Sequence, residues 1–257
     1  MLITLDVGNS HTVIGIYDGE NLTHHWRIQT VPERTTDEHG ALLNTLLAGA
    51  GIEPAGFKPE GVIIACVVPP LNQSMEQLAE RYFRCIPVMV GPGIKTGMPI
   101  LYENPKEVGA DRIVNAIAAY ERYSGACIVV DFGTATSFDY ITGRGEYAGG
   151  AIAPGLDVSM DALIARAAKL YRVELVRPRE AVGRTTIASI QSGLIFGYTA
   201  LVDGLVHRIR KERGERARVI ATGGLAELIA RESETIEEVD EFLTLKGLRL
   251  IFERNRR

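Results

Sequence analysis

The chain has 257 residues, of which 46% are hydrophobic and 23% charged, and its formal net charge is -4. This composition is ordinary for a globular protein, the length allows one large domain or two of about 125 residues, and the slight acidity argues against a general nucleic-acid-binding surface. Because no apolar run approaches the roughly 18 residues that span a bilayer, and an acidic residue at position six is atypical of a signal peptide, we expect a cytoplasmic protein with no membrane or nucleic-acid partner.

Three cysteines, Cys66, Cys85 and Cys127, lie far apart in apolar segments. Their number is odd and none belongs to a CxxC pair, so neither a disulfide framework nor a zinc site is expected. We expect buried, reduced thiols that pack as small hydrophobic groups.

The first half of the chain opens with three predicted strands that tight turns connect, one of them carrying the Asp-Gly signal of a hairpin. Alternating helix and strand signals follow. In chain order we expect strands over residues 2–7, 11–18 and 22–29, a helix over 36–50, a strand from Gly61, a helix that Pro69 and Pro70 open toward Phe83, a strand over 86–90, a loop over 91–109 and a helix over 111–123.

The second half repeats this order. We expect strands over residues 126–133, 135–142 and 145–155, helices over 156–168 and about 186–213, a strand over 217–224 and an amphipathic helix over 240–255. Three strands followed by helices and strands, twice, predict an α/β fold of two duplicated domains with mostly buried sheets. We place these domains at residues 1–122 and 123–257, each a mixed sheet of three antiparallel strands and then parallel ones, flanked by helices.

Two similar stretches, "LDVGNSHT" at residues 5–12 and "VDFGTATS" at residues 130–137, follow the first strand of each half. A Gly-rich hairpin exposes backbone N–H groups, and small residues let an anion approach closely. Asp6 and Asp131 would point into a cleft, where two carboxylates can face an anion only with a cation between them. The pattern therefore favours a nucleotide phosphate with bound Mg²⁺.

Hydroxyl and amide side chains in both stretches add donors for phosphate oxygens. These residues are Asn9, Ser10, Thr12, Thr134, Thr136 and Ser137. One such stretch alone would favour an ordinary β-hairpin, since short Gly motifs occur by chance, but two copies at equivalent places favour the nucleotide site. A third motif, "VIATGGLAE" at residues 219–227, ends a strand in two glycines where adenine or ribose could lie against the backbone.

Taken together, "DVGNSHT", "DFGTATS" and "ATGGLAE" resemble the two phosphate motifs and the adenosine motif of the acetate and sugar kinase, heat-shock chaperone and actin superfamily, whose domains are ribonuclease H-like. Within it the chain resembles the type III pantothenate kinase family over essentially its whole length. The resemblance is most specific at "ENPKEVGADRIVNA", and it extends to "IVVDFGTATSFD", "GGAIAPG" and "LTLKGL".

The resemblance implies phosphoryl transfer from ATP to the primary hydroxyl of pantothenate, which gives 4'-phosphopantothenate in the first step of coenzyme A synthesis. It makes Asp111 the general base, a role that a carboxylate at a helix start can fill and that is compatible with Asp111 being a helix N-cap. Arg112 and the backbone of Gly109 and Ala110 would hold pantothenate, and Tyr102 would line its pocket. An Arg suits a small carboxylate, although an Arg in a first helical turn is more often a solvated charge.

For the nucleotide, the resemblance implies contacts from the first hairpin and from one residue of the second. The implied ATP-binding residues are Asp6, Val7, Gly8, Asn9, Ser10, His11, Thr12, Val13 and Thr134. Asp6 would also help to position Mg²⁺, and Asp131 would lie at a monovalent cation site for K⁺ or NH₄⁺.

One departure from the family concerns "GRTT" at residues 183–186, where the family usually has Gly-Lys-Asn-Thr. Thr186 still matches a substrate-contacting Thr that the family supplies across a dimer interface, so the resemblance implies a homodimer. Arg184 and Thr185 leave the neighbouring contacts open.

Two other functions stay open from the sequence: another small-molecule kinase of the same fold, and a nucleotide-binding regulatory protein, since members of this family were also described as accessory factors for transcription. The "GADR" motif at residues 109–112 favours a kinase, because a binding module needs no base aimed at the γ-phosphate. Three other short motifs do not indicate a different function. "GPGIKTG" lacks the spacing of a Walker phosphate loop, and "DFG" is not accompanied by the HRD and VAIK motifs of a protein kinase. Glutamates interrupt the basic run "RIRKERGERARVI", so a solvated helix end is expected there rather than a nucleic-acid site.

Overall fold

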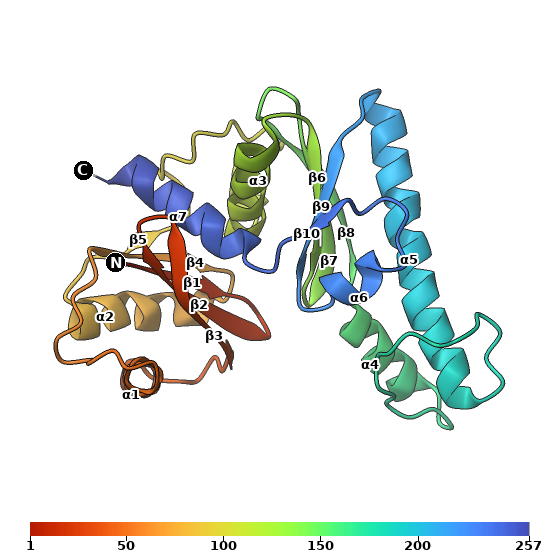
Figure 1. Cartoon of the computed structure of the whole chain (residues 1–257), viewed down its shortest axis with the longest axis horizontal. Coiled ribbons are helices and arrows are strands. Elements are labelled where there is room, and N and C mark those ends of the chain that lie inside the picture. The colour runs from red at the N-terminus through yellow and green to blue at the C-terminus, as the bar shows by residue number, and fades with distance from the viewer. Residues whose placement is uncertain (257) are drawn as a thin grey trace. The chain divides into compact units, whose positions relative to one another are not determined.

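The structure, a computed structural model, describes residues 1–256 and divides the chain into two compact units (Figure 1). Unit 1 contains Met1–Gly97, Asn104–Ala118 and the segment from Thr244 onward, and unit 2 contains Met98–Glu103 and Ala119–Leu243. The C-terminal segment thus belongs to the unit that begins the chain. The division into domains at residue 122 stays a prediction.

Unit 1 is built on a five-stranded sheet in the order β3-β2-β1-β4-β5, with β1 antiparallel to β2 and parallel to β4. Its strands are β1 (Leu2–Val7), β2 (His11–Asp18), β3 (Asn21–Gln29), β4 (Gly61–Cys66) and β5 (Val88–Met89). Its helices are α1 (Thr36–Gly49), α2 (Asn72–Phe83), the start of α3 (Ala110–Tyr123) and α7 (Leu243–Asn255) from Thr244 onward.

The two faces of this sheet are buried by different helices. Ile3 and Leu5 of β1 belong to a core cluster that also holds Leu43 of α1 and Leu78 of α2. Successive side chains of a strand point to opposite faces, so Thr4 and Asp6 lie on the other face. There a Cβ at Gly15, the β2 partner of Thr4, would meet Leu245 of α7. Helix α7 therefore covers the face that carries Asp6.

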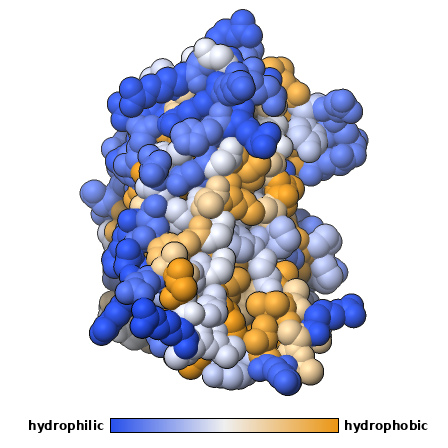
Figure 2. Space-filling model, turned by 90° about the vertical axis from the view of Figure 1, so that its right-hand side faces the viewer, coloured by the Kyte–Doolittle hydropathy of each residue, from blue (hydrophilic) through white to orange (hydrophobic). Residues whose placement is uncertain are grey.

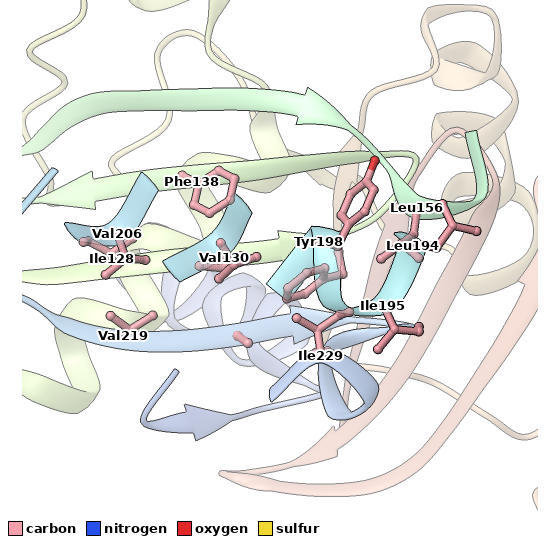
Figure 3. Packing of buried hydrophobic residues seen from close by; sticks show 14 of the residues in the cluster. Ile128, Val130, Phe138, Leu156, Leu194, Ile195, Tyr198, Val206, Val219 and Ile229 are labelled. Atoms are coloured by element: carbon pink, nitrogen blue, oxygen red, sulfur yellow. The ribbon is translucent and has the colours of Figure 1, made fainter. Parts of the chain in front are cut away.

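Unit 2 repeats this design with a sheet in the order β10-β9-β6-β7-β8. Its elements are β6 (Cys127–Phe132), β7 (Ala135–Ile141), β8 (Tyr147–Pro154), α4 (Leu156–Arg166), α5 (Thr186–Arg213), β9 (Arg218–Gly223), α6 (Ala226–Ala230) and β10 (Glu238–Val239). Ile128, Val130 and Phe138 of the sheet pack against Ile195 and Val206 of α5 in one core cluster (Figure 3). Outward from β1 and from β6 the strand order is the same, which confirms the predicted duplicated fold.

Small differences from the predicted elements have local causes. Pro69–Leu71 forms a separate 3₁₀ turn before α2, since proline lacks the N–H that a helix interior needs. Helix α4 ends at Arg166 rather than at residue 168, and the strand expected over 86–90 is reduced to β5. Strand β10 was not predicted, because two residues carry no alternation pattern.

Helix α5 is longer and more apolar than any segment expected from unbroken apolar runs. Within residues 1–256 it is the one helix long and apolar enough by composition to cross a membrane, a test that the core helix of a soluble protein also passes. Ser189, Gln191 and Ser192 interrupt it, so a search for unbroken apolar runs misses it. Its Ile195, Val202 and Val206 are fully buried in the core of unit 2.

Candidate active site

The first Gly turn, between β1 and β2, is held at both ends by backbone hydrogen bonds. The N–H of Gly8 donates to the carbonyl of His11 at 3.0 Å, and the N–H of Thr30, just after β3, donates to the carbonyl of Ser10 at 3.0 Å. The buried hydroxyls of Thr12 and Thr30 lie 2.8 Å apart and form a hydrogen bond. The end of β3 therefore fixes the shape of this turn.

A hollow of about 570 Å³ opens beside this turn. It is lined by Asn9, Ser10, His11, Arg27, Ile28, Gln29 and Thr30. Asp6 is half-buried and pairs with Val13, so both lie on the same face of the sheet. At the end of β4, burial raises the pKa of the Cys66 thiol, and the Asp6 carboxylate adds to the rise, so this thiol stays protonated at neutral pH.

The second Gly turn, between β6 and β7, has the same hydrogen-bond pattern. The N–H of Gly133 donates to the carbonyl of Ala135, and the N–H of Gly155 donates to the carbonyl of Thr134, both at 3.0 Å. Phe132 pairs with Thr136, as Val7 pairs with Thr12 in unit 1, so this turn is one residue shorter. Thr134 therefore occupies the position of Ser10, because the carbonyls of both residues accept the equivalent hydrogen bond. Aligning the two motifs from their Asp residues would instead match Thr134 with Asn9.

Thr136 is the counterpart of Thr12, but its surroundings differ. Its Oγ1 atom is buried and has no hydrogen-bond partner within residues 1–256. The cause lies in Gly155, which stands where unit 1 has Thr30 and offers no hydroxyl. A Cβ at Gly155 would lie 2.5 Å from the carbonyl oxygens of Gly133 and Thr134, so no side chain fits there.

Gly223, at the end of β9, packs directly against the second turn. Its φ of +93° is a conformation that favours glycine. A Cβ here would lie 2.7 Å from Oδ1 of Asp131 and 2.6 Å from the carbonyl oxygen of Phe132. Because Gly223 has no side chain, its backbone lies directly against the Asp131 carboxylate and the Phe132 carbonyl.

The "GADR" motif forms the start of α3. The helix begins at Ala110, so Asp111 lies inside the first turn rather than at the N-cap position, and its Oδ1 accepts a hydrogen bond from the Arg112 N–H at 2.8 Å. A Cβ at Gly109 would lie 2.5 Å from the same carboxylate oxygen. Arg112 is only 9% exposed, so it is not the solvated surface charge that an Arg in a first helical turn usually is. Asp111 is half-buried.

Helix α7 supports this start of α3, a role that the sequence did not reveal. The Thr244 hydroxyl donates to Oδ1 of Asn115, which is fully buried, at 2.8 Å. A Cβ at Gly247 would collide with the carbonyl oxygen of Val114. The two helices therefore pack backbone against backbone, which ties the "LTLKGL" segment to the helix that carries Asp111.

Tyr102 lies in unit 2, against the β7–β8 region. Its ring centroid is 6.4 Å from that of Tyr147, and a Cβ at Gly149 would lie 3.6 Å from its ring. The Tyr147 hydroxyl donates to Oδ1 of Asp139 at 2.7 Å, and the Ser137 hydroxyl donates to Oδ2 at 3.0 Å. Asp139 is a fully buried carboxylate that the sequence analysis did not single out, because it occupies an ordinary strand position.

Thr186 opens α5 in unit 2. The hydroxyl of Thr185 caps the helix by accepting from the Ala188 N–H at 3.1 Å. A hollow of about 820 Å³ surrounds this helix start. It is lined by Leu163, Leu170, Gly183, Arg184, Thr185, Thr186, Ser189, Ile190, Gly193 and Leu194.

The candidate residues thus fall into two groups. Residues 6–13 and 109–112 belong to unit 1, and Tyr102, Asp131, Thr134 and Thr186 belong to unit 2. Within residues 1–256 no three His, Cys, Asp or Glu side chains gather as a metal cluster.

The duplicated sheets, each with an Asp and a Gly turn after its first strand, define an actin-like ATPase fold. Solved structures agree: MreB 5 of Spiroplasma citri, described as bound to AMPPNP, superposes with a TM-score of 0.55 at 10% identity and covers 99% of this chain and 96% of its own. A protein of Campylobacter jejuni described as a Baf family transcriptional activator gives a TM-score of 0.61 at 18% identity over 98% of both chains. At these identities the likeness shows the fold alone.

The family follows from closer comparisons. The family model described as type III pantothenate kinase matches residues 2–208. A type III pantothenate kinase of Anaeromyxobacter sp. (strain K) is 58% identical over 256 residues and covers 100% of both chains. The chain therefore belongs to the type III pantothenate kinase family, and it is a phosphotransferase of coenzyme A biosynthesis that uses ATP.

Proposed function

We propose that Asp111 is the general base in the transfer of the γ-phosphoryl group of ATP to the primary hydroxyl of pantothenate. Its carboxylate accepts the hydroxyl proton while the oxygen attacks phosphorus. A new P–O bond forms, the bond to the leaving oxygen breaks, and ADP and 4'-phosphopantothenate result. The observation that carries this assignment is the fixed carboxylate of Asp111, which the Arg112 N–H and the absence of a side chain at Gly109 hold in one orientation.

ATP binds at the two Gly turns in this proposal. The first turn offers Asp6, Val7, Gly8, Asn9, Ser10, His11, Thr12 and Val13, and the second offers Thr134. The support is the exposure of Asn9, Ser10 and His11 beside an open hollow, while Thr30 holds the turn from behind. Such a turn presents backbone N–H groups to phosphate oxygens with little rearrangement.

Pantothenate binds at the start of α3 through Gly109, Ala110 and Arg112, with Tyr102 lining the pocket. Arg112 is largely buried, and the planar fork of N–H donors on a guanidinium matches the two oxygens of a carboxylate ligand.

Mg²⁺ fits Asp6, because this ion is usually held by one or two carboxylates together with substrate phosphates rather than by an all-protein cage. The half-buried carboxylate of Asp6 supplies one such ligand. When bound, Mg²⁺ neutralises charge on the phosphate oxygens.

A monovalent cation, K⁺ or NH₄⁺, fits the second turn. Asp131 and the Phe132 carbonyl lie directly against Gly223. A carboxylate and a carbonyl offer oxygen ligands, which suit a hard cation of low charge.

We also propose that the protein is a homodimer that forms through the apolar surface near α4 and α5, so that Thr186 reaches the partner's substrate. Seven of the ten exposed large hydrophobic side chains lie between residues 152 and 187; they are Ile152, Val158, Leu163, Tyr171, Val176, Val182 and Ile187. Figure 2 views the chain from the side of α5 and shows hydrophobic surface gathered there. A surface of this kind is typical of a protein–protein contact. We place the enzyme in the cytoplasm, without nucleic-acid or membrane partners.

The proposal is tested by coupled ADP release with ATP and pantothenate, with and without K⁺. We expect turnover that requires pantothenate and rises with K⁺. Folded protein that releases ADP only with another alcohol would point to a different small-molecule kinase, and folded protein that binds ATP without turnover would point to a regulatory protein. Light scattering tests the dimer, and a monomer at assay concentration would contradict it.

A further inference from the structure

Arg27 of β3 lies in line with the first Gly turn. The strand registers pair Asp6 with Val13 and Val13 with Arg27. Residues paired across neighbouring strands point to the same face of a sheet, so these three side chains form one row on the face that carries Asp6. Only β2 lies between β3, which carries Arg27, and β1, which carries Asp6. Neighbouring strands are about 4.8 Å apart, so the two side chains lie close together along this row.

The hollow beside the turn adds a second observation. Arg27 lines it together with Asn9, Ser10 and His11, and no acidic residue is among its lining. Arg27 is exposed, and within residues 1–256 it makes no hydrogen bond or ion pair. Its guanidinium is therefore a positive charge without a protein partner, next to a turn whose N–H groups suit an anion.

The duplicated unit provides an internal comparison. In unit 2 the matching row runs from Asp131 through Ser137 to Ile152. Ile152 is 63% exposed and carries no charge. At this position a positively charged side chain therefore occurs only in unit 1, whose turn we expect to hold the phosphates.

We propose that Arg27 binds the terminal phosphates of ATP from the β3 side of the first turn; this inference rests on the nucleotide site of the proposed function. A guanidinium can give two parallel N–H bonds to one phosphate, which fixes its orientation as well as its charge. Arg27 is then a substrate-binding residue that holds the nucleotide while α3 supplies the base.

The experiment compares the full-length wild type with Arg27→Gln, Arg27→Lys and the matched control Arg208→Gln. Arg208 is also exposed and makes no hydrogen bond or ion pair within residues 1–256, but it lies near the C-terminal end of α5 and lines neither of the two hollows described above. The dissociation constant of a non-hydrolysable ATP analogue is measured at several salt concentrations, and KM for ATP and for pantothenate is measured in the coupled assay.

For Arg27→Gln we expect the analogue to bind about tenfold to a hundredfold more weakly, the range for a lost hydrogen-bonded charge, with a shallower salt dependence. KM for ATP should rise by a similar factor while KM for pantothenate stays unchanged. Arg27→Lys should fall between wild type and Arg27→Gln, because it keeps the charge and loses the fork. Thermal unfolding without nucleotide should not change, because Arg27 is exposed on an edge strand.

Arg27→Gln that binds the analogue as Arg208→Gln does, with an unchanged salt dependence, would overturn the inference. Its failure is distinguishable from failure of the proposed function. If the wild type shows no turnover with pantothenate but Arg27→Gln still weakens binding of the ATP analogue, the proposed kinase activity is refuted and the proposed phosphate contact is supported.

Discussion

The two Gly turns share a backbone pattern and differ in what surrounds it. In both, the glycine N–H closes the turn, and an N–H from the end of the third strand holds the turn carbonyl. At three matching positions, unit 1 has Arg27, Thr30 and Cys66 where unit 2 has Ile152, Gly155 and Gly223. The first turn therefore has a guanidinium, a hydroxyl and a thiol beside it.

The second turn has glycines that approach it closely. The backbones of Gly155 and Gly223 lie directly against carbonyl oxygens and the Asp131 carboxylate, and within residues 1–256 the Thr136 hydroxyl has no hydrogen-bond partner. A set of oxygen acceptors suits a cation, whereas N–H donors beside a guanidinium suit phosphate. In the proposed function, duplication supplied two similar turns, and a few side chains give them different ligands.

The largest expected effect comes from a residue in neither turn. Asp111→Asn should lower kcat by roughly 10²–10⁴, the usual loss for a general base, because the amide cannot accept the hydroxyl proton. Binding of an ATP analogue should remain as in wild type, since the proposed function places Asp111 against pantothenate and not against the nucleotide. The check is steady-state kinetics together with calorimetry. Turnover close to the wild-type rate would assign the base elsewhere and reopen a catalytic role for the turns.

The next prediction concerns the stability of unit 1 at acidic pH. Within residues 1–256, His39 of α1 is the one buried histidine, and burial, aided by Arg34, lowers its pKa to about 4. Between pH 6.5 and 4 the unfolded chain binds a proton that the folded unit 1 does not. The free energy of unfolding should therefore fall by about 3 kcal/mol as the pH falls through this range.

Trp26, the chain's single tryptophan, packs against the core of unit 1, so its fluorescence in urea reports this unit. His39→Leu should flatten the dependence on pH over this window, since the buried imidazole that binds a proton only in the unfolded chain is then absent. An unchanged slope in His39→Leu would show that another group causes the acid sensitivity.

A smaller effect tests the difference between the two buried threonines. Thr12→Val should lower the free energy of unfolding by about 1–3 kcal/mol, because it leaves the Thr30 hydroxyl buried without its partner. Thr136→Val should be nearly neutral, because its hydroxyl has no protein partner within residues 1–256. Urea titrations followed by Trp26 fluorescence for unit 1 and by circular dichroism for the whole chain measure both. Equal losses would mean that the two turns are packed alike.

The sequence was sufficient for the features that local patterns determine. Strand alternation, the Asp-x-Gly turns and "GADR" predicted the duplicated sheets and the placing of Asp111 at a helix start. What it missed depends on register and tertiary packing: the one-residue offset that matches Thr134 to Ser10, the Thr12–Thr30 hydrogen bond, and the buried Asp139.

The packing of α7 in unit 1 could not be predicted from the sequence either. The amphipathic pattern of its residues predicts a helix with one buried face, but it does not say which sheet that face meets. Only the packing of Gly247 on α3 and of Leu245 on β2 shows that the last helix supports the helix that carries Asp111.

The divergence of the two turns is tested most directly by a K⁺ titration of pantothenate-dependent ADP release, with choline to keep the ionic strength constant. Asp131→Asn and Asp6→Asn are the matched variants, since each removes the carboxylate before one turn. We expect Asp131→Asn to lose stimulation by K⁺, and Asp6→Asn to keep it while requiring more Mg²⁺ and ATP. The same response to K⁺ in both variants would contradict the assignment of phosphate to the first turn and of the monovalent cation to the second.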